Sequence, residues 1–230
     1  MEIRAFGSGS AGNCYHISDG KTELLLEAGL PYRKIQKALD FGLSKISGVL
    51  ISHAHADHAR ALHALADAGT DCWINEYTKD SMDAHGFRIH VAEEGKQFGI
   101  GSFAIKPFNL HHDIPILGFL ISSGDEKLVY ITDSAYCRYK FPGLTHIMVE
   151  ANYSKAILDA NVANGSVPAE LRNRVLQTHF SIENVIEFLK ANDLTNVREI
   201  FLLHMSDGNG DELAFKREVE KLTGIMVKVF

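Results

Sequence analysis

The sequence predicts a mixed α/β fold of the α+β kind, with two β-sheets packed face to face and flanked by helices. Short apolar, β-branched runs alternate with a few helix-like stretches along the chain. These runs fall into two similar halves, which suits two sheets. The 230 residues, 46% of them hydrophobic, can bury the core of one domain, so we predict a single domain over residues 1–230.

The first half of the chain contains most of the predicted turns and a helix with one apolar face. Ile35 and Leu39 share that face, so the helix is expected to pack on a sheet. The predicted strands are 1–6, 14–18, 23–27, 46–51 and 71–75, and the predicted helices are 32–41, 59–68 and, more weakly, 76–85.

The second half repeats the pattern with longer helices. Ser181 suits the N-cap of the helix that follows it, because its hydroxyl can accept a hydrogen bond from the first helical turn. The predicted strands are two runs within 98–109, then 118–122, 127–131, 145–150, 198–203 and 225–230, and the predicted helices are 182–191 and 212–223, after a helical, loop-rich stretch over 153–173.

Composition narrows the classes of function. No apolar run is long enough to span a membrane, and residues 1–6 lack the apolar core of a signal peptide. The three cysteines are widely spaced without a C-x-x-C pair, as is typical of reduced thiols in a cytoplasmic protein. The formal net charge is −6, so the chain does not resemble a non-specific nucleic-acid binder. We therefore predict a cytoplasmic protein with no membrane partner.

The densest chemical signal lies at residues 53–58, His-Ala-His-Ala-Asp-His. It follows a buried strand and precedes a helix, so its ligand-type side chains lie on a turn at a strand's carboxyl end. Imidazole and carboxylate are common ligands for Zn²⁺ and other divalent first-row ions. His53 and His55, two apart on an extended backbone, can bind one ion, and Asp57 and His58 can face a second.

This motif matches the H-x-H-x-D-H signature of the metallo-β-lactamase superfamily. Its phosphodiester-cleaving hydrolases, including the tRNase Z-like enzymes, are the most similar branch. The opening Gly-Ser-Gly-Ser-Ala-Gly-Asn-Cys run at 7–14 resembles the small YycJ/WalJ-type proteins, which are regarded as DNA exonucleases. The resemblance extends over almost the whole chain and implies the four-layer αββα metallo-β-lactamase sandwich.

The resemblance also implies a ligand set for two divalent ions, Zn²⁺ or Mn²⁺. Three further ligands follow predicted strands: His112, Asp133 as the bridging carboxylate, and His204. His111 remains the alternative to His112, because adjacent histidines cannot be distinguished without the register of the strand. The first ion is assigned to His53, His55 and His112, the second to Asp57, His58 and His204, and Asp133 bridges them.

The resemblance assigns supporting roles to other residues. Glu27 stands where the family usually has Asp, and it and Glu150 are expected to brace the ligands from behind. Ser10 and Asn13, in the Gly/Ser-rich turn, are expected to contact substrate. Asp57 is expected to orient the attacking hydroxide. His179, placed at a helix amino terminus, is expected to contact the substrate phosphate or to protonate the leaving group.

The implied activity is metal-dependent phosphodiester hydrolysis in nucleic acid, exonuclease-like, by a hydroxide that two metal ions activate. The alternative is a phosphodiesterase of small nucleotides such as cyclic nucleotides, which the acidic charge and short chain favour. Two readings from other classes are a non-catalytic metal-binding scaffold and a thiolesterase of the glyoxalase II kind. The substrate is therefore nucleic acid or a nucleotide, and a homodimer is a possible assembly because many relatives form one.

Overall fold

The computed structural model describes all residues, 1–230, and the chain divides into two compact units. The first unit comprises Met1–Asn109 and Ile114–Asp125, and the second comprises Leu110–Asp113 and Glu126–Phe230. The predicted single domain stays a prediction.

The first unit is built on a six-stranded sheet with strands in sequence order from β1 to β6. β1, β2 and β3 pair antiparallel, and β3 to β6 pair parallel. The strands are β1 (Glu2–Gly7), β2 (Cys14–Ser18), β3 (Glu23–Leu26), β4 (Ile46–Leu50), β5 (Cys72–Ile74) and β6 (Ile89–Val91). Three further strands of this unit pair antiparallel in order: β7 (Phe98–Ile100), β8 (Phe103–Asn109) and β9 (Leu117–Ser123). Only β6 lies outside the predicted strands; none of its three residues is buried, so no apolar run marks it in the sequence.

Short helices cover the parallel part of the six-stranded sheet. Ile35 and Leu62 share one buried apolar cluster with Leu25 and Val49 of the sheet, so packing on the strands stabilises these helices. The helices are α1 (Tyr32–Ala38), the 3₁₀ turn η1 (Leu43–Lys45), α2 (Ala56–Ala59), α3 (Leu62–Asp67) and α4 (Glu76–Ser81).

The helix predicted over 59–68 begins earlier and is interrupted at residues 60–61. The cause is competition for backbone hydrogen bonds. The Asp57 carbonyl accepts from Asn13 N at 2.8 Å, and the Ala61 N–H donates to the Ala28 carbonyl at 2.8 Å. Because these groups bond to other segments, a continuous helical ladder cannot form there.

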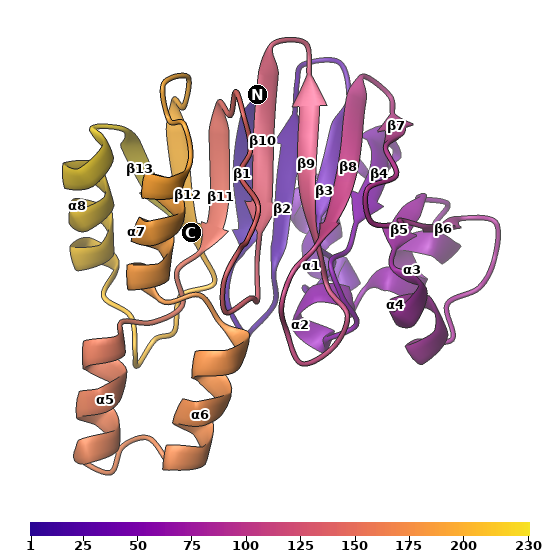
Figure 1. Cartoon of the computed structure of the whole chain (residues 1–230). Coiled ribbons are helices and arrows are strands. Elements are labelled where there is room, and N and C mark those ends of the chain that lie inside the picture. The colour runs from indigo at the N-terminus through magenta and orange to yellow at the C-terminus, as the bar shows by residue number, and fades with distance from the viewer. The chain divides into compact units, whose positions relative to one another are not determined.

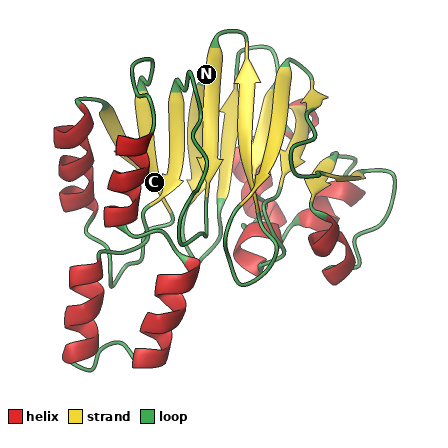
Figure 2. Cartoon of the chain, viewed as in Figure 1, coloured by secondary structure: helices red, strands yellow, loops and turns green.

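The second unit contains four parallel strands in the order β10 (Glu126–Ile131), β11 (His146–Glu150), β12 (Glu199–Leu203) and β13 (Met226–Val229). Its helices are α5 (Lys155–Ala163), α6 (Ala169–Thr178), α7 (Ile182–Ala191) and α8 (Glu212–Thr223). Figure 1 shows α7 and α8 beside β12 and β13, with α5 and α6 as a separate pair beyond their ends, and Figure 2 shows the same strands and helices by type. The bounds of α7 and α8 agree with the sequence-based prediction.

His179 lies between two helices. Its N–H donates to the Val175 carbonyl at 3.0 Å, so it ends α6. Ser181 is the N-cap of α7, as predicted, and its side chain accepts from Asn184 N at 3.2 Å. His179 therefore stands two residues before the cap of α7, where the sequence placed it, and it is at the same time the C-cap of α6.

No helix of the chain combines the length and the apolar character that a membrane crossing requires.

Candidate metal centre

In the first unit, the loop that follows β4 brings His53 and His55 together. His53 is buried, with Nδ1 at 2.8 Å from the Ser52 hydroxyl and Nε2 at 3.1 Å from Nδ1 of His55. Their ring centroids are 4.7 Å apart and nearly perpendicular. Two nitrogens that share a tetrahedral Zn²⁺ at about 2.05 Å are about 3.3 Å apart, so this pair suits one ion.

Asp57 and His58 form a second pair of donors on the same loop. His58 Nε2 lies 3.4 Å from Asp57 Oδ2, and its Nδ1 faces Glu27 Oε1 at 3.5 Å. The other Glu27 oxygen accepts from Ser52 N at 3.1 Å. Glu27 is fully buried. Because its two oxygens contact Ser52 and His58, its carboxylate holds both the start and the end of the histidine loop.

Asn13 also holds this loop. Its side chain is fully buried, and Oδ1 accepts from Gly9 N at 2.9 Å and from the Tyr15 hydroxyl at 3.1 Å. Its Nδ2 donates to the Asp57 carbonyl at 3.2 Å and lies 3.1 Å from His58 Nε2. The amide therefore joins the Gly/Ser-rich turn to the ligand loop, a contact that sequence spacing does not reveal.

In the second unit, His111 and His112 have different surroundings. Nδ1 of His112 donates to the Thr178 carbonyl at 3.0 Å, since a carbonyl can only accept, and this leaves Nε2 as the nitrogen that can bind a metal. Nε2 lies 3.1 Å from Asp113 Oδ1, where a positive charge is favoured. The ring of His111 instead lies 5.3 Å from the ring of Tyr136. These contacts favour His112 as the ligand.

Glu150, the last residue of β11, bonds to two of the histidines and to two backbone groups of the second unit. Its Oε1 accepts from Nδ1 of His179 at 2.6 Å and from Nδ1 of His204 at 2.9 Å. Its Oε2 accepts from the backbone N–H groups of Ser134 at 3.2 Å and Phe180 at 3.0 Å. One buried side chain thus orients two imidazoles, whose Nε2 atoms point away from it.

This contact shifts the pKa of both partners. Burial alone raises the pKa of Glu150, but the charge of His179 and the hydrogen bonds from His179 and His204 outweigh burial and lower that pKa. Burial alone lowers the pKa of His179, but the Glu150 carboxylate outweighs it and raises that pKa. Both shifts favour an imidazolium–carboxylate pair.

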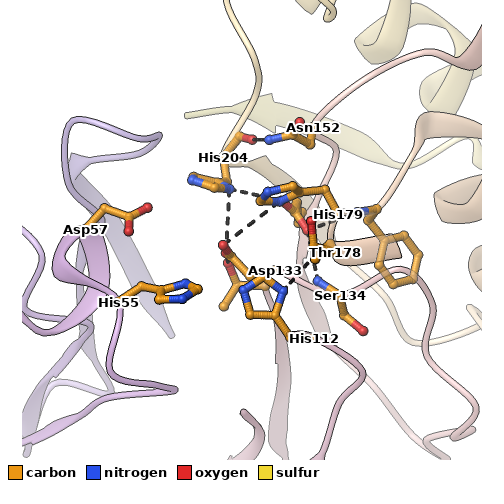
Figure 3. Close-up of polar contacts among 12 residues, drawn as sticks. His55, Asp57, His112, Asp133, Ser134, Asn152, Thr178, His179 and His204 are labelled. Carbon is orange, nitrogen blue, oxygen red and sulfur yellow. Dashed lines mark hydrogen bonds and ion pairs between the residues drawn. The ribbon is translucent and has the colours of Figure 1, made fainter. Parts of the chain in front are cut away.

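Asp133 lies two residues beyond β10, against the same group. Its Oδ1 accepts from the Thr132 hydroxyl at 2.6 Å and is 3.5 Å from Nδ1 of His204, and its Oδ2 is 3.9 Å from Nδ1 of His179 (Figure 3). The donor atoms of Asp133, Glu150, His179 and His204 all lie within 4.8 Å of one another.

Three of these residues have a backbone conformation that side chains rarely adopt. The φ angles are +64° for Glu27, +45° for Asp133 and +53° for His204, and each residue directly follows a strand or stands two residues after one. Such a conformation costs roughly 1–3 kcal/mol per residue and persists where the surroundings enforce it, commonly at functional sites. In both units, strained backbone is therefore found at residues that the sequence assigned to the site: Glu27 in the first unit, and Asp133 and His204 in the second.

Several supporting contacts had no signal in the sequence. The Thr178 contact with His112 is made by a backbone carbonyl, which any residue supplies. The Ser134 hydroxyl accepts from His111 N at 3.0 Å, and Asn152 donates to the His204 carbonyl at 2.8 Å. Asn75, the N-cap of α4, also donates to the Ser52 carbonyl at 3.2 Å. Of these residues only Asn75 could have been noticed in the sequence, because a cap-type residue stands there directly after a strand.

The donors suit divalent metal ions. The two pairs of the first unit and the cluster of the second consist of imidazole nitrogens and carboxylate oxygens, the ligand chemistry of Zn²⁺ and Mn²⁺, and contain no thiol. Ser10 is exposed in its turn. The ligand, catalytic and substrate-contact roles assigned from the sequence stay predictions.

Residues 23–205 match the family described as the beta-lactamase superfamily domain. The chain belongs to this family. Exodeoxyribonuclease WalJ of Streptococcus pneumoniae is 30% identical over 234 residues, covering 94% of this chain and 86% of that protein. Exodeoxyribonuclease YycJ of Bacillus anthracis is 25% identical, covering 93% and 86%.

The solved structure of the metallo-beta-lactamase fold protein YhfI from Bacillus subtilis has a TM-score of 0.78 with 16% sequence identity, covering 99% of this chain and 95% of that one. At that identity the likeness shows the fold alone. The predicted fold class is confirmed: the chain has the mixed α/β metallo-β-lactamase fold, with two sheets and helices.

Proposed function

We propose that this protein is a metal-dependent phosphodiesterase that hydrolyses phosphodiester bonds in nucleic acid, in the manner of an exonuclease. The observation that carries the proposal is the gathering of buried imidazoles and carboxylates at strand ends, with strained backbone at Glu27, Asp133 and His204. Family membership and the two relatives named as exodeoxyribonucleases support a hydrolase that acts on nucleic acid.

The proposal keeps the predicted ligands for two divalent ions, Zn²⁺ or Mn²⁺. When bound, such ions provide a nucleophile at neutral pH and stabilise negative charge on phosphoryl oxygens. The full set of residues proposed to bind them is His53, His55, Asp57, His58, His112, Asp133 and His204.

The chain's own residues orient the reaction. Asp57, at the amino end of α2, accepts a hydrogen bond from the attacking water and directs it. Glu150 holds Nδ1 of His179, so the charged ring is stabilised and Nε2–H can donate its proton to the leaving oxygen. Ser10, which is exposed, is proposed to contact substrate directly. Asn13 is fully buried, with its backbone N–H bonded to the Asp57 carbonyl and its carbonyl bonded to Gly29 N, so we propose that it serves substrate contact by holding the turn that presents Ser10.

The test is hydrolysis of bis-p-nitrophenyl phosphate by metal-loaded protein beside an Asp133→Ala variant. We expect cleavage by the parent protein and a loss of at least 100-fold in the variant. Single-stranded DNA, RNA and cyclic nucleotides follow with the same samples. Cleavage of the DNA from one end supports the exonuclease, and cleavage of cyclic nucleotides alone selects the small-nucleotide alternative.

Absence of cleavage of every phosphodiester, with metal bound in a measured ratio, would contradict the proposal. The hypothesis of a thiolesterase or of a non-catalytic metal-binding scaffold would then replace it. Gel filtration of the same samples tests the predicted homodimer.

A further inference from the structure

A pocket of about 440 Å³ opens in the first unit where β5, β6 and the start of β7 meet. Three rings line it: Trp73 on β5, His90 on β6 and Phe98 at the start of β7. Lys96 and Glu93 line it from the turn between β6 and β7. None of these residues belongs to the candidate metal centre.

The three rings form a nearly parallel stack. The Trp73 and Phe98 centroids are 5.7 Å apart with planes 6° from parallel, and Trp73 and His90 are 4.7 Å apart at 24°. Trp73 lies over Gly48 of β4, where an added Cβ would come within 2.3 Å of the indole ring. Gly48 therefore permits the flat placement of Trp73. All three rings are half-buried, so the stack is packed against the protein and still reachable from solvent.

Polar contacts hold the rim of the pocket. Nε2 of His90 lies 2.8 Å from Asp71 Oδ1, while Arg88 donates to the other Asp71 oxygen at 2.9 Å. Lys96 pairs with Glu93 at 2.5 Å, and both side chains are more than half exposed, at 71% and 55%. An exposed pair of this kind contributes little, so a phosphate can take the place of the Glu93 carboxylate.

The pocket and the histidine loop are on adjacent strands of one sheet. The Trp73 carbonyl accepts from Ile51 N at 3.0 Å, and Ile51 stands two residues before His53. A ligand anchored over Trp73 is thus held by the strand next to the one that ends in the ligand loop.

We propose that this stacking pocket, defined by Trp73, His90, Phe98 and Lys96, binds a nucleobase of a single-stranded nucleic acid, with Lys96 on the adjacent phosphate. Stacking on flat aromatic side chains beside a cation is how proteins hold single strands without reading their sequence. The volume is in the range of pockets for small ligands and admits one nucleotide. The inference rests on the proposed function and adds a substrate subsite to it.

The chain offers a direct reporter, because Trp73 is its only tryptophan. Zinc-loaded protein is titrated with a phosphorothioate-linked thymidine 12-mer, which resists cleavage, while Trp73 emission is recorded. We expect saturable quenching, with the dissociation constant raised at least fivefold by Phe98→Leu and by Lys96→Gln. Lys190→Gln is the matched control, because Lys190 forms a similar exposed pair with Glu187 on α7, at 3.0 Å. Its dissociation constant should equal that of the parent protein.

The same variants are assayed with bis-p-nitrophenyl phosphate, which has neither a nucleobase nor a second phosphate for the pocket to bind, and its hydrolysis should be unchanged. Hydrolysis of DNA without quenching of Trp73, or quenching that neither variant weakens, overturns the stacking pocket and leaves the proposed function intact. Quenching that the variants weaken, without hydrolysis of any phosphodiester, supports the pocket and removes the proposed function. Quenching by a linear oligosaccharide but not by the 12-mer also overturns the assignment. If Phe98→Leu fails to fold, Lys96→Gln decides alone.

Discussion

At the scale of single residues, Glu150 orients two histidines of the second unit and binds two of its backbone N–H groups. Its Oε1 accepts from two imidazoles and its Oε2 from two backbone N–H groups, all while fully buried. A carboxylate is the one side chain that offers four acceptor sites and no donor. The protonation of His179 and the tautomer of His204 therefore depend on this residue.

We predict that Glu150→Gln weakens metal binding and activity by 10- to 100-fold each. With its oxygen kept on the backbone N–H groups, the amide turns donor hydrogens toward both Nδ1 atoms. His179 then loses its Nδ1 proton and its charge, and His204 is forced into the tautomer with the proton on Nε2, which cannot bind a metal. The measurements are metal stoichiometry by mass spectrometry and kcat/KM with bis-p-nitrophenyl phosphate. Glu183→Gln, on α7, is the control for loss of one charge. Parent-like metal affinity in a folded Glu150→Gln protein would refute the positioning role.

At the scale of elements, the turns of the first unit are joined by one aspartate. Asp19, between β2 and β3, accepts from Lys21 N at 2.9 Å and Thr22 N at 2.8 Å. Its other oxygen accepts from the Ser123 hydroxyl at 2.5 Å and from the Ser102 hydroxyl. Turns far apart in sequence are therefore held by one acceptor.

These bonds make stability depend on pH. Slight burial raises the pKa of Asp19, but the bonds from Ser102, Ser123 and the two backbone groups outweigh it and hold that pKa well below its usual range. Because the folded pKa is depressed, the stabilisation is present above the unfolded pKa of about 3.9 and is lost as pH falls toward the folded value.

We predict that Asp19→Asn lowers the free energy of unfolding by about 1 kcal/mol at pH 7, a figure reduced because the side chain is partly exposed. The difference from the parent protein should shrink below pH 4, where the parent begins to lose the same stabilisation. Urea denaturation at pH 7 and pH 3 measures both values, with Asp125→Asn in the exposed turn before β10 as the charge control. An equal difference at both pH values would show that the charge is irrelevant.

At the scale of the whole molecule, neither compact unit is a continuous piece of chain. Residues 110–113 belong to the second unit, and 114–125 return to the first. The chain therefore passes between the units three times, and neither unit can be cut out at one linker. This connectivity supports the prediction of a single domain over residues 1–230.

We predict one calorimetric unfolding transition whose calorimetric and van't Hoff enthalpies agree. Zinc loading should raise Tm and chelation should lower it, because metal ions bind the folded ligands more tightly than the unfolded ones. Two separated transitions in the metal-loaded protein would show two independent domains, and a Tm indifferent to metal would contradict the metal centre.

The sequence by itself determined the elements with strong local patterns and the family. The helices at 182–191 and 212–223 agree with the structure because their apolar spacing and caps lie within the helix itself. The motif at 53–58 could also be recognised from the sequence, since its metal-ligand side chains are close together in the chain and follow the end of a strand. These features depend on neighbours in sequence.

Only the tertiary structure decided which groups share a partner. Glu150 meets His179 and His204, which stand 29 and 54 positions away, and no local pattern announces such pairs. The break between α2 and α3 likewise comes from bonds to distant residues, against the helical preference of the local sequence. The stack of Trp73, His90 and Phe98 joins three strands. Residues far apart in sequence come into contact only in the folded chain. The tertiary structure therefore shows these contacts, and patterns between sequence neighbours do not.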